Sequence, residues 1–417
     1  MHSKKCSVSI SKNMSSRLHL FISNNVWCLL FFGILLRPVL SFGQNSPDFV
    51  NVKDFGASGD GVSDDTKAIQ FALSILPENG GVLYFPSGHY LSEKIKGKNY
   101  MTFAGDATFS WLPDSNGSPV ISPLNGDMGC LFDLDGCVGV KLVGLVLDGQ
   151  KKGENMDGVF SGRSNEEQVI PFEGTFRKSL GEEQNIIIED CKISNFSGCG
   201  VRFNLGWVWA IRKSIISSNG LDGFNITGYD GYIIDCIFAL NGRMGIYGDG
   251  FTASTITASR IELNGAGGIY IGRGSGLQIA NSFFCENSGP AIWIDGAKKV
   301  RAITISGNIF RRNGKNRNQK PELNSNISLF NASGVVVSGN SFHHMTLPWD
   351  DPKPYRWPRY SIFTDSLNDC VITGNAMYQG AWEELICNRG EHKNTVIENN
   401  PGRLVNLSNG SGELKTN

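Results

Sequence analysis

Five consecutive stretches of the chain decide the fold: CKISNFSGCGVRF (191–203), SIISSNGLDGFNI (214–226), CIFALNGRMGIYG (236–248), SRIELNGAGGIYI (259–271) and SFFCENSGPAIWI (282–294). Each begins with a short run of mostly apolar residues, turns at an asparagine, and continues with apolar residues at alternate positions. Their first residues are 22 or 23 positions apart. Short strands of period two within a repeat of this length predict one coil of a parallel β-helix per repeat.

The same column continues with wider spacing at Asn308, Asn340 and Asn375. Leucine-rich repeats share the period, but they need a leucine ladder and a helix-forming stretch in each unit, and these repeats have neither. The expected fold class is therefore all-β, a right-handed, single-stranded parallel β-helix. We expect it to span residues 44–402, with the clearest repeats in 185–400 and a tail at 403–417. The positions predicted to face the core are Ile186, Ile188, Ile193, Val201, Phe203, Phe224, Ile226, Ile269, Ile271, Ile292 and Ile294.

Composition and charge agree with a turn-rich β protein. The chain has 51 glycines, 40% apolar residues and 18% charged residues. Its net charge of −1 provides no basic stripe that would displace counterions from a phosphate backbone. We therefore expect no nucleic-acid partner.

The N-terminal residues 1–43 have the pattern of a signal peptide. Basic residues precede an apolar run from Val26 to Leu36, and small residues follow near Gly43. Eleven apolar residues are fewer than the ~20 that span a bilayer. We expect a secreted, periplasmic or cell-surface protein with no membrane span in its mature form. Cleavage of this segment would leave eight of the ten cysteines. Cys191 and Cys236 are two coils apart, roughly 9.6 Å at ~4.8 Å per coil, which is too far for a disulfide, so we expect both to be buried thiols.

The open end of a stack of coils needs a cover, because exposed strand edges pair with other chains. Residues 44–80 are predicted to supply it. Ser63 and Asp64 are candidate caps for a helix over Asp65–Leu76, whose apolar residues fall on one face.

The segment NVKDFGA (51–57), followed by GDGVSDDT (59–66), GGV (80–82) and FPSG (85–88), resembles the entry motif of the pectate-lyase-like superfamily. The resemblance extends through the repeats to about residue 400. It implies a right-handed parallel β-helix, and the superfamily contains lyases, glycosidases, epimerases and phage tailspikes.

The chain is also similar to the catalytic module of alginate C5-epimerases, at LDG (147–149), DGVF (157–160), SGCG (197–200) and NGLDGF (219–224). Where that family carries Tyr-Gly-Phe-Asp-Pro-His, this chain has CGVRFN (199–204), and where it carries Arg-His the chain has Arg243-Met244. Asp222 and Arg243 are the site residues that match. Polygalacturonases share the Asp222-Gly223-Phe224 element, but their paired aspartates and their Gly-His-Gly are replaced.

Two columns of side chains are predicted to point outward in register, because side chains alternate along a strand. Three aromatic rings about 4.8 Å apart form a flat surface that suits the apolar faces of sugars. Cross-strand stabilisation is the alternative role for these rings. One column contains Arg202, Asn225, Tyr247, Tyr270 and Trp293; the other contains Asn204, Thr227, Asp249, Gly272 and Asp295, with Asp222, Arg243 and Arg273 at the rims.

Three hypotheses for action on a polysaccharide are open, and the leading one is β-elimination by a secreted enzyme on a uronate-containing polymer. A lyase acting on a uronate needs a cation for the carboxylate, supplied by Arg202, Arg243 or Arg273, and a base such as Tyr247 or Tyr270. A hydrolase would use two carboxylates among Asp222, Asp249 and Asp295. The third alternative is a non-catalytic polysaccharide-binding module.

Two insertions flank this surface, at residues 150–184 and 345–361, and long loops in solenoids often carry function. The second contains Trp349 and Arg356, which we expect to contact the substrate. No cofactor or metal is assigned, although Ca²⁺ held by oxygen ligands could replace an arginine. The expected partner is the polysaccharide, and the expected state is a monomer.

Overall fold

The computed structural model describes residues 48–111, 118–162, 183–296, 299–316, 318–343 and 357–405. The chain divides into two units, residues 1–45 and 46–417, and the fold described below is that of the second. The predicted signal peptide lies outside the described residues, as do Trp349, Arg356 and most of the tail.

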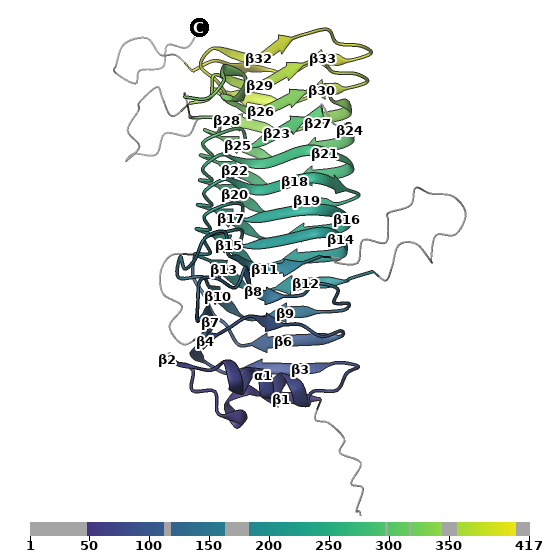
Figure 1. Ribbon diagram of the computed structural model, residues 1–417. Helices are drawn as coiled ribbons and strands as arrows, with labels where there is room; N and C mark the ends of the chain where they lie inside the picture. Colours follow the sequence, from purple (N-terminus) through teal and green to yellow (C-terminus); the bar gives the residue numbers. More distant parts are fainter. Residues whose placement is uncertain are drawn as a thin grey trace, which may run out of the picture. The chain divides into compact units, whose positions relative to one another are not determined.

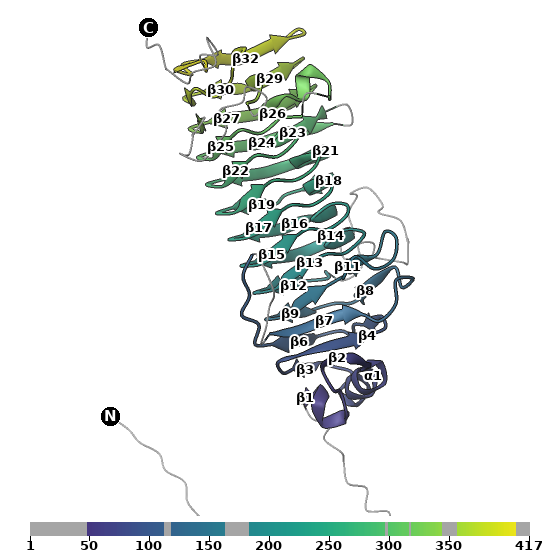
Figure 2. The same ribbon diagram turned by 90° about the vertical axis from the view of Figure 1, so that its left-hand side faces the viewer.

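Two parallel sheets run along the stack of coils, and every strand pairing within them is parallel (Figures 1 and 2). The larger sheet, sheet A, contains β1 (Phe49–Asn51), β3 (Gly81–Phe85), β5 (Ile95–Lys96), β6 (Met101–Gly105), β8 (Cys130–Asp133), β9 (Lys141–Val143), β11 (Asp157–Ser161), β12 (Ile186–Glu189), β14 (Val201–Arg212), β16 (Phe224–Ile234), β18 (Met244–Thr252), β19 (Thr255–Thr257), β21 (Gly267–Ala280), β23 (Ile292–Asp295), β24 (Val300–Ser306), β26 (Ser325–Phe330), β27 (Ser333–Ser338), β29 (Tyr360–Asp365), β30 (Val371–Thr373), β32 (Glu384–Arg389) and β33 (Val396–Glu398). Sheet B contains β2 (Asp60–Asp64), β4 (Gly88–Ser92), β7 (Pro119–Pro123), β10 (Val146–Asp148), β13 (Lys192–Ser194), β15 (Ile215–Ser217), β17 (Ile237–Ala239), β20 (Arg260–Glu262), β22 (Phe283–Cys285), β25 (Ile309–Arg311), β28 (Ser341–His343), β31 (Ala376–Tyr378) and β34 (Gly402–Arg403). The predicted parallel β-helix is confirmed.

The core is one continuous column of apolar side chains inside the coils. All eleven residues predicted to face inward are buried. The rings of Phe284, Phe310 and Phe342 stack in three successive coils, with centroids 5.0 and 4.8 Å apart. Apolar burial contributes about 25 cal/mol per Å², so this column is the main source of stability in the stack.

Two ladders of buried polar side chains follow the turns. The residues of the predicted repeat column bond from coil to coil; Asn308 Nδ2, for example, donates to Asn340 Oδ1 at 3.0 Å. A second ladder uses the asparagine of each Asn-Gly pair, and Asn241 Nδ2 donates to Asn264 Oδ1 at 3.0 Å. Each amide thereby satisfies backbone groups that a tight turn would leave unpaired.

The N-terminal cover is helix α1 (Thr66–Ile75), which lies beside β1 and the short 3-10 helix η1 (Val52–Phe55) at one end of the stack (Figure 1). Its apolar face is buried, as predicted, although the helix is one residue shorter at each end than expected. Asp64 Oδ1 accepts a hydrogen bond from the Thr66 N–H at 2.9 Å. Asp65 instead accepts the backbone N–H groups of Ser58 and Gly59.

The eight described cysteines are all free and buried, including Cys191 and Cys236. Both were predicted to be buried thiols, and this is confirmed. Among the described residues, no helix is both long enough and apolar enough to cross a membrane.

Candidate functional site

Three aromatic residues, Tyr247, Tyr270 and Trp293, form a continuous surface across β18, β21 and β23; we call it the aromatic strip. Tyr247 and Tyr270 stack with centroids 4.9 Å apart and an interplanar angle of 15°. Trp293 meets Tyr270 edge-on at 4.9 Å. All three side chains are partly exposed. Strand pairing places Arg202 opposite Asn225, Asn225 opposite Tyr247, and the strip residues opposite one another, so the first predicted column is confirmed.

The second predicted column is wrong at Asp249. Asn204 pairs with Thr227 as expected, and Asn204 is exposed. The register then shifts between β18 and β21, so that Asp249 lies opposite Arg273 and not Gly272. The cause is an irregularity of the β-bulge type, which adds a residue to one strand and interrupts the alternation. Asp249 and Asp295 therefore do not share a column, and the spacing expected for two hydrolytic carboxylates does not follow from the coil repeat.

Asp249 and Arg273 form a partly exposed ion pair next to the strip. Arg273 Nε lies 3.7 Å from Asp249 Oδ1, and the arginine side chain is 55% exposed. The guanidinium also donates to the Asp249 carbonyl at 3.4 Å. Because the arginine is exposed, the pair adds little stability, and the guanidinium is accessible to a ligand.

Asp222 was predicted to lie at an exposed rim, but it is fully buried. Its Oδ1 accepts the Met244 N–H at 3.1 Å. Its Oδ2 accepts Asn225 Nδ2 at 2.9 Å and Arg243 at 3.0 Å. This carboxylate is saturated by the protein itself, and it positions Asn225 and Arg243.

Arg243 extends from buried Asp222 toward the strip. Its guanidinium carbon lies 5.4 Å from the centre of the Tyr247 ring, and its side chain is 46% exposed. The Arg243 guanidinium is therefore bonded to a buried carboxylate, lies near an aromatic ring and is accessible to solvent. Guanidinium groups bind carboxylates through two parallel hydrogen bonds, so Arg243 is suited to an anionic ligand.

Arg202 pairs with a second buried aspartate, Asp157, which was not predicted to be a site residue. Arg202 Nε donates to Asp157 Oδ2 at 2.6 Å, and a terminal nitrogen donates to Cys199 Sγ at 3.2 Å. Burial raises the pKa of the Cys199 thiol to about 12, which keeps it protonated. The sequence does contain a signal that could have identified Asp157. The pair Asp157-Gly158 repeats the Asp-Gly pattern of Asp222-Gly223.

Tyr270 is a phenol with a raised proton affinity. Burial raises its pKa to about 12, and the negative charge of Asp295 is the next largest cause. A Cβ atom on Gly272 would lie 2.8 Å from the Tyr270 hydroxyl, so the ring passes close over a residue with no side chain. Tyr270 is therefore protonated at neutral pH.

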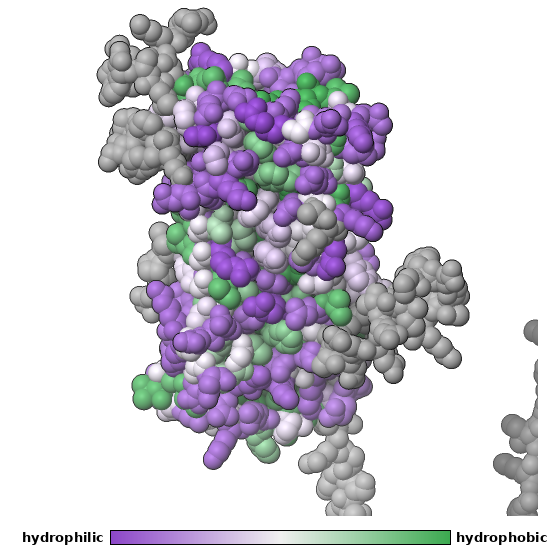
Figure 3. Space-filling model, turned by 45° about the horizontal axis from the view of Figure 1, so that its top comes forward, coloured by the Kyte–Doolittle hydropathy of each residue, from purple (hydrophilic) through white to green (hydrophobic). Residues whose placement is uncertain are grey.

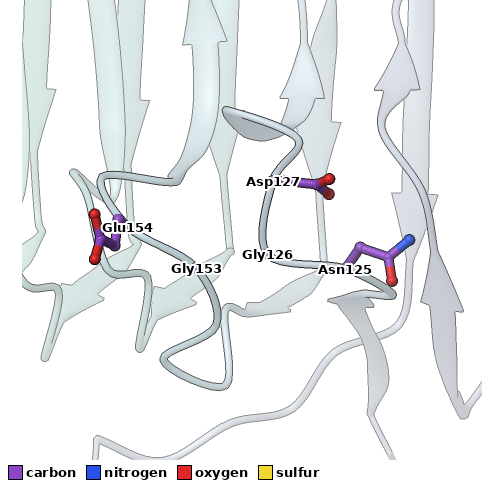
Figure 4. A pocket seen from close by; sticks show the side chains of 5 residues that line it. All are labelled: Asn125, Gly126, Asp127, Gly153 and Glu154. Atoms are coloured by element: carbon purple, nitrogen blue, oxygen red, sulfur yellow. The ribbon is translucent and has the colours of Figure 1, made fainter.

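Other parts of the described surface show fewer features of a functional site. Figure 4 shows a polar hollow between two turns of the N-terminal coils, lined by Asn125, Gly126, Asp127, Gly153 and Glu154, and it contains no strip residue. Figure 3 shows small hydrophobic patches among hydrophilic residues on the face presented. Within the described ranges, no three His, Cys, Asp or Glu residues are grouped closely enough to hold a metal ion.

Two family models match the sequence. The model described as right handed beta helix region matches residues 179–317 and 244–417. The model for rhamnogalacturonase A/epimerase, pectate lyase-like, matches residues 49–122.

Similar proteins come from Azotobacter vinelandii. Mannuronan C5-epimerase AlgE5 is 29% identical over 279 residues, which are 60% of this chain and 25% of that protein. Alginate lyase 7 is 30% identical over 199 residues, which are 42% of this chain and 20% of that protein. The chain thus matches only a fifth to a quarter of their length. The A-module of mannuronan C-5 epimerase AlgE4 superposes with a TM-score of 0.56 at 19% identity, covering 85% of this chain and 99% of that module, which shows a shared fold.

Proposed function

Because this chain belongs to the right-handed β-helix family, within the pectate-lyase-like superfamily, we propose that it is a carbohydrate-active enzyme that cleaves a uronate-containing polysaccharide by β-elimination. The observation that carries the proposal is Arg243, fixed by buried Asp222 and supported by Tyr247 at the edge of the aromatic strip. A sugar stacked on the strip would bring its carboxylate to this guanidinium.

The proposed reaction uses groups on adjacent coils. Arg243 neutralises the uronate carboxylate, which makes the C5 proton easier to remove. The phenolate form of Tyr247 takes that proton as the base and becomes the phenol, the C4–O bond breaks, and a double bond forms between C4 and C5. Tyr270, protonated at neutral pH, donates a proton to the leaving oxygen.

The relatives support a uronate as the substrate class. The matched proteins include mannuronan C5-epimerases and an alginate lyase, both of which are named for action on uronate polymers. A hydrolase receives less support, because Asp222 is buried and saturated and Asp249 is out of register with Asp295. Export from the cytoplasm remains part of the proposal.

A non-catalytic binding protein is the second candidate. The observation that favours it is Arg202, which pairs with Asp157 and lies in the stretch where alginate C5-epimerases carry Tyr-Gly-Phe-Asp-Pro-His. In that case the strip and Arg243 would hold the polymer without cleaving it.

The test is incubation of the protein with polymannuronate, polyguluronate, polygalacturonate and a neutral glucan. β-Elimination produces an unsaturated product that absorbs in the ultraviolet, whereas hydrolysis produces reducing ends without that absorbance. We expect ultraviolet-absorbing product from at least one polyuronate, and at least a tenfold loss of rate in Arg243→Ala. Reducing ends alone would contradict the lyase, and retention without any product would favour the binding protein.

A further inference from the structure

We propose that the aromatic strip is closed at the end beyond Trp293, so that the protein binds the end of a polysaccharide chain and not its interior. This inference rests on the proposed function and names the part of the substrate that the site accepts. Its basis is a change in exposure along one column of side chains.

The column of the strip continues through the C-terminal coils. Strand pairing places Ser328 opposite Trp293, Phe363 opposite Ser328, and Cys387 opposite Phe363. Residues of the column from Arg202 to Trp293 are partly exposed. In contrast, Ser328 and Cys387 are 0% exposed and Phe363 is 3% exposed. This column is therefore accessible up to Trp293 and buried in the next three coils.

The cover next to Trp293 is an arm of the chain, residues 314–324, of which residue 317 is not described. It contains the short helix η3 (Pro321–Leu323). The Glu322 carbonyl accepts a hydrogen bond from the Ser328 hydroxyl at 2.8 Å, which places the backbone of the arm directly on the position that follows Trp293 in the column. The Ser325 hydroxyl, in turn, lies 2.6 Å from that of Ser328.

The arm is held in this position by several polar contacts. Gln319 Nε2 donates to the Leu323 carbonyl at 2.8 Å and to the Ser288 carbonyl at 3.4 Å. Asn324 Nδ2 donates to the Asn316 carbonyl at 2.6 Å. A sugar placed beyond Trp293 would have to displace these bonds, whereas a sugar on Tyr247 meets no comparable barrier from the arm.

The binding surface therefore ends at Trp293, and a bound polymer chain cannot extend past this residue. A terminal sugar can stack on Trp293 and stop against the arm, with the rest of the chain running back over Tyr270 and Tyr247. An internal sugar cannot occupy the same place, because the polymer would have to continue through the arm.

The number of protein molecules bound per polymer chain tests the proposal, with or without catalysis. Polymannuronate and polygalacturonate fractions of several defined lengths are titrated by calorimetry at 4 °C, with product formation monitored in parallel. We expect one protein per chain at every length. A number that increases with chain length would overturn the chain-end inference and leave the proposed function intact, whereas absence of binding to every polyuronate would contradict both.

Removal of the arm provides a second test. A Cβ atom on Gly314 would lie 2.4 Å from the Ser325 nitrogen, so the two ends of the arm are adjacent and two glycines can replace residues 315–323. In this variant we expect the number bound per chain to increase with length. The matched control is Tyr378→Ala, which removes an exposed aromatic ring under Arg403 on sheet B and should leave the stoichiometry at one. An unchanged stoichiometry in a folded arm-shortened protein would contradict the proposal.

Discussion

Buried Asp222 and partly exposed Asp249 are both acidic partners of arginines near the strip, but their surroundings predict effects of different size for the same substitution. Asp222→Asn leaves an amide facing donors from Asn225 and Arg243, so at least one buried group loses its partner. We expect the free energy of unfolding to decrease by about 2 kcal/mol. Asp249→Asn, at an ion pair whose arginine is exposed, should change it by less than about 0.5 kcal/mol. Chemical denaturation measures both, and equal effects would contradict the structural role of Asp222.

The raised pKa of Tyr270 predicts that the free energy of unfolding depends on pH in the alkaline range. Its pKa is raised from 10.0 to about 12, so between these values the folded protein retains a proton that the unfolded chain has lost. The folded state binds more protons, and the free energy of unfolding therefore decreases as pH rises through this window. Below pH 10 both states are protonated and the contribution is constant. Urea denaturation at several pH values should show a shallower decline in Tyr270→Phe than in the wild type; equal slopes would contradict the shift.

Alternation of side chains along single strands predicted part of the candidate site. The column from Arg202 to Trp293 follows from the period-two alternation, and pairing confirms it. Asp249 was misplaced because an irregularity in strand pairing breaks that alternation, and nothing in the glycine-rich sequence around it distinguishes a bulge from a regular strand. Asp222 was recognised as part of an Asp-Gly motif, but its burial depends on contacts with Asn225, Arg243 and Met244 that sequence spacing does not reveal.

The turns between strands depend on the asparagine ladder, and Asn264 is a central member. Its side chain accepts the Asn241 N–H and donates to the Phe238 carbonyl and to Asn287. Asn264→Ala leaves several buried groups unpaired, each costing about 1–3 kcal/mol, so we expect a loss of about 3 kcal/mol in unfolding free energy. The control is Asn318→Ala at an exposed position, expected to change it by less than about 0.5 kcal/mol. A small effect of Asn264→Ala would show that water replaces the ladder.

Over the whole molecule, the repeat period predicted the stack, and the entry motif and helix pattern predicted its N-terminal cover. The arm that closes the strip was visible only as a wider gap, 32 residues between Asn308 and Asn340. A gap shows that residues are inserted, but the direction in which they fold depends on hydrogen bonds such as that from Ser328 to Glu322. Sequence periodicity therefore predicted the scaffold better than the limits of the site.

The N-terminal cover has a role that only the complete stack defines. In a solenoid each coil contacts its neighbours, and the terminal coil needs a cap with a polar outer face. Ile69 of α1 is 0% exposed in the common core, whereas the adjacent Gln70 is exposed. Ile69→Asp buries a charge at this junction and should detach the helix, exposing the edge of the first coil to pairing with other chains. We expect light scattering after size-exclusion chromatography to show aggregates for Ile69→Asp and a single species for Gln70→Asp; equal behaviour of the two variants would mean that α1 does not protect the end of the stack.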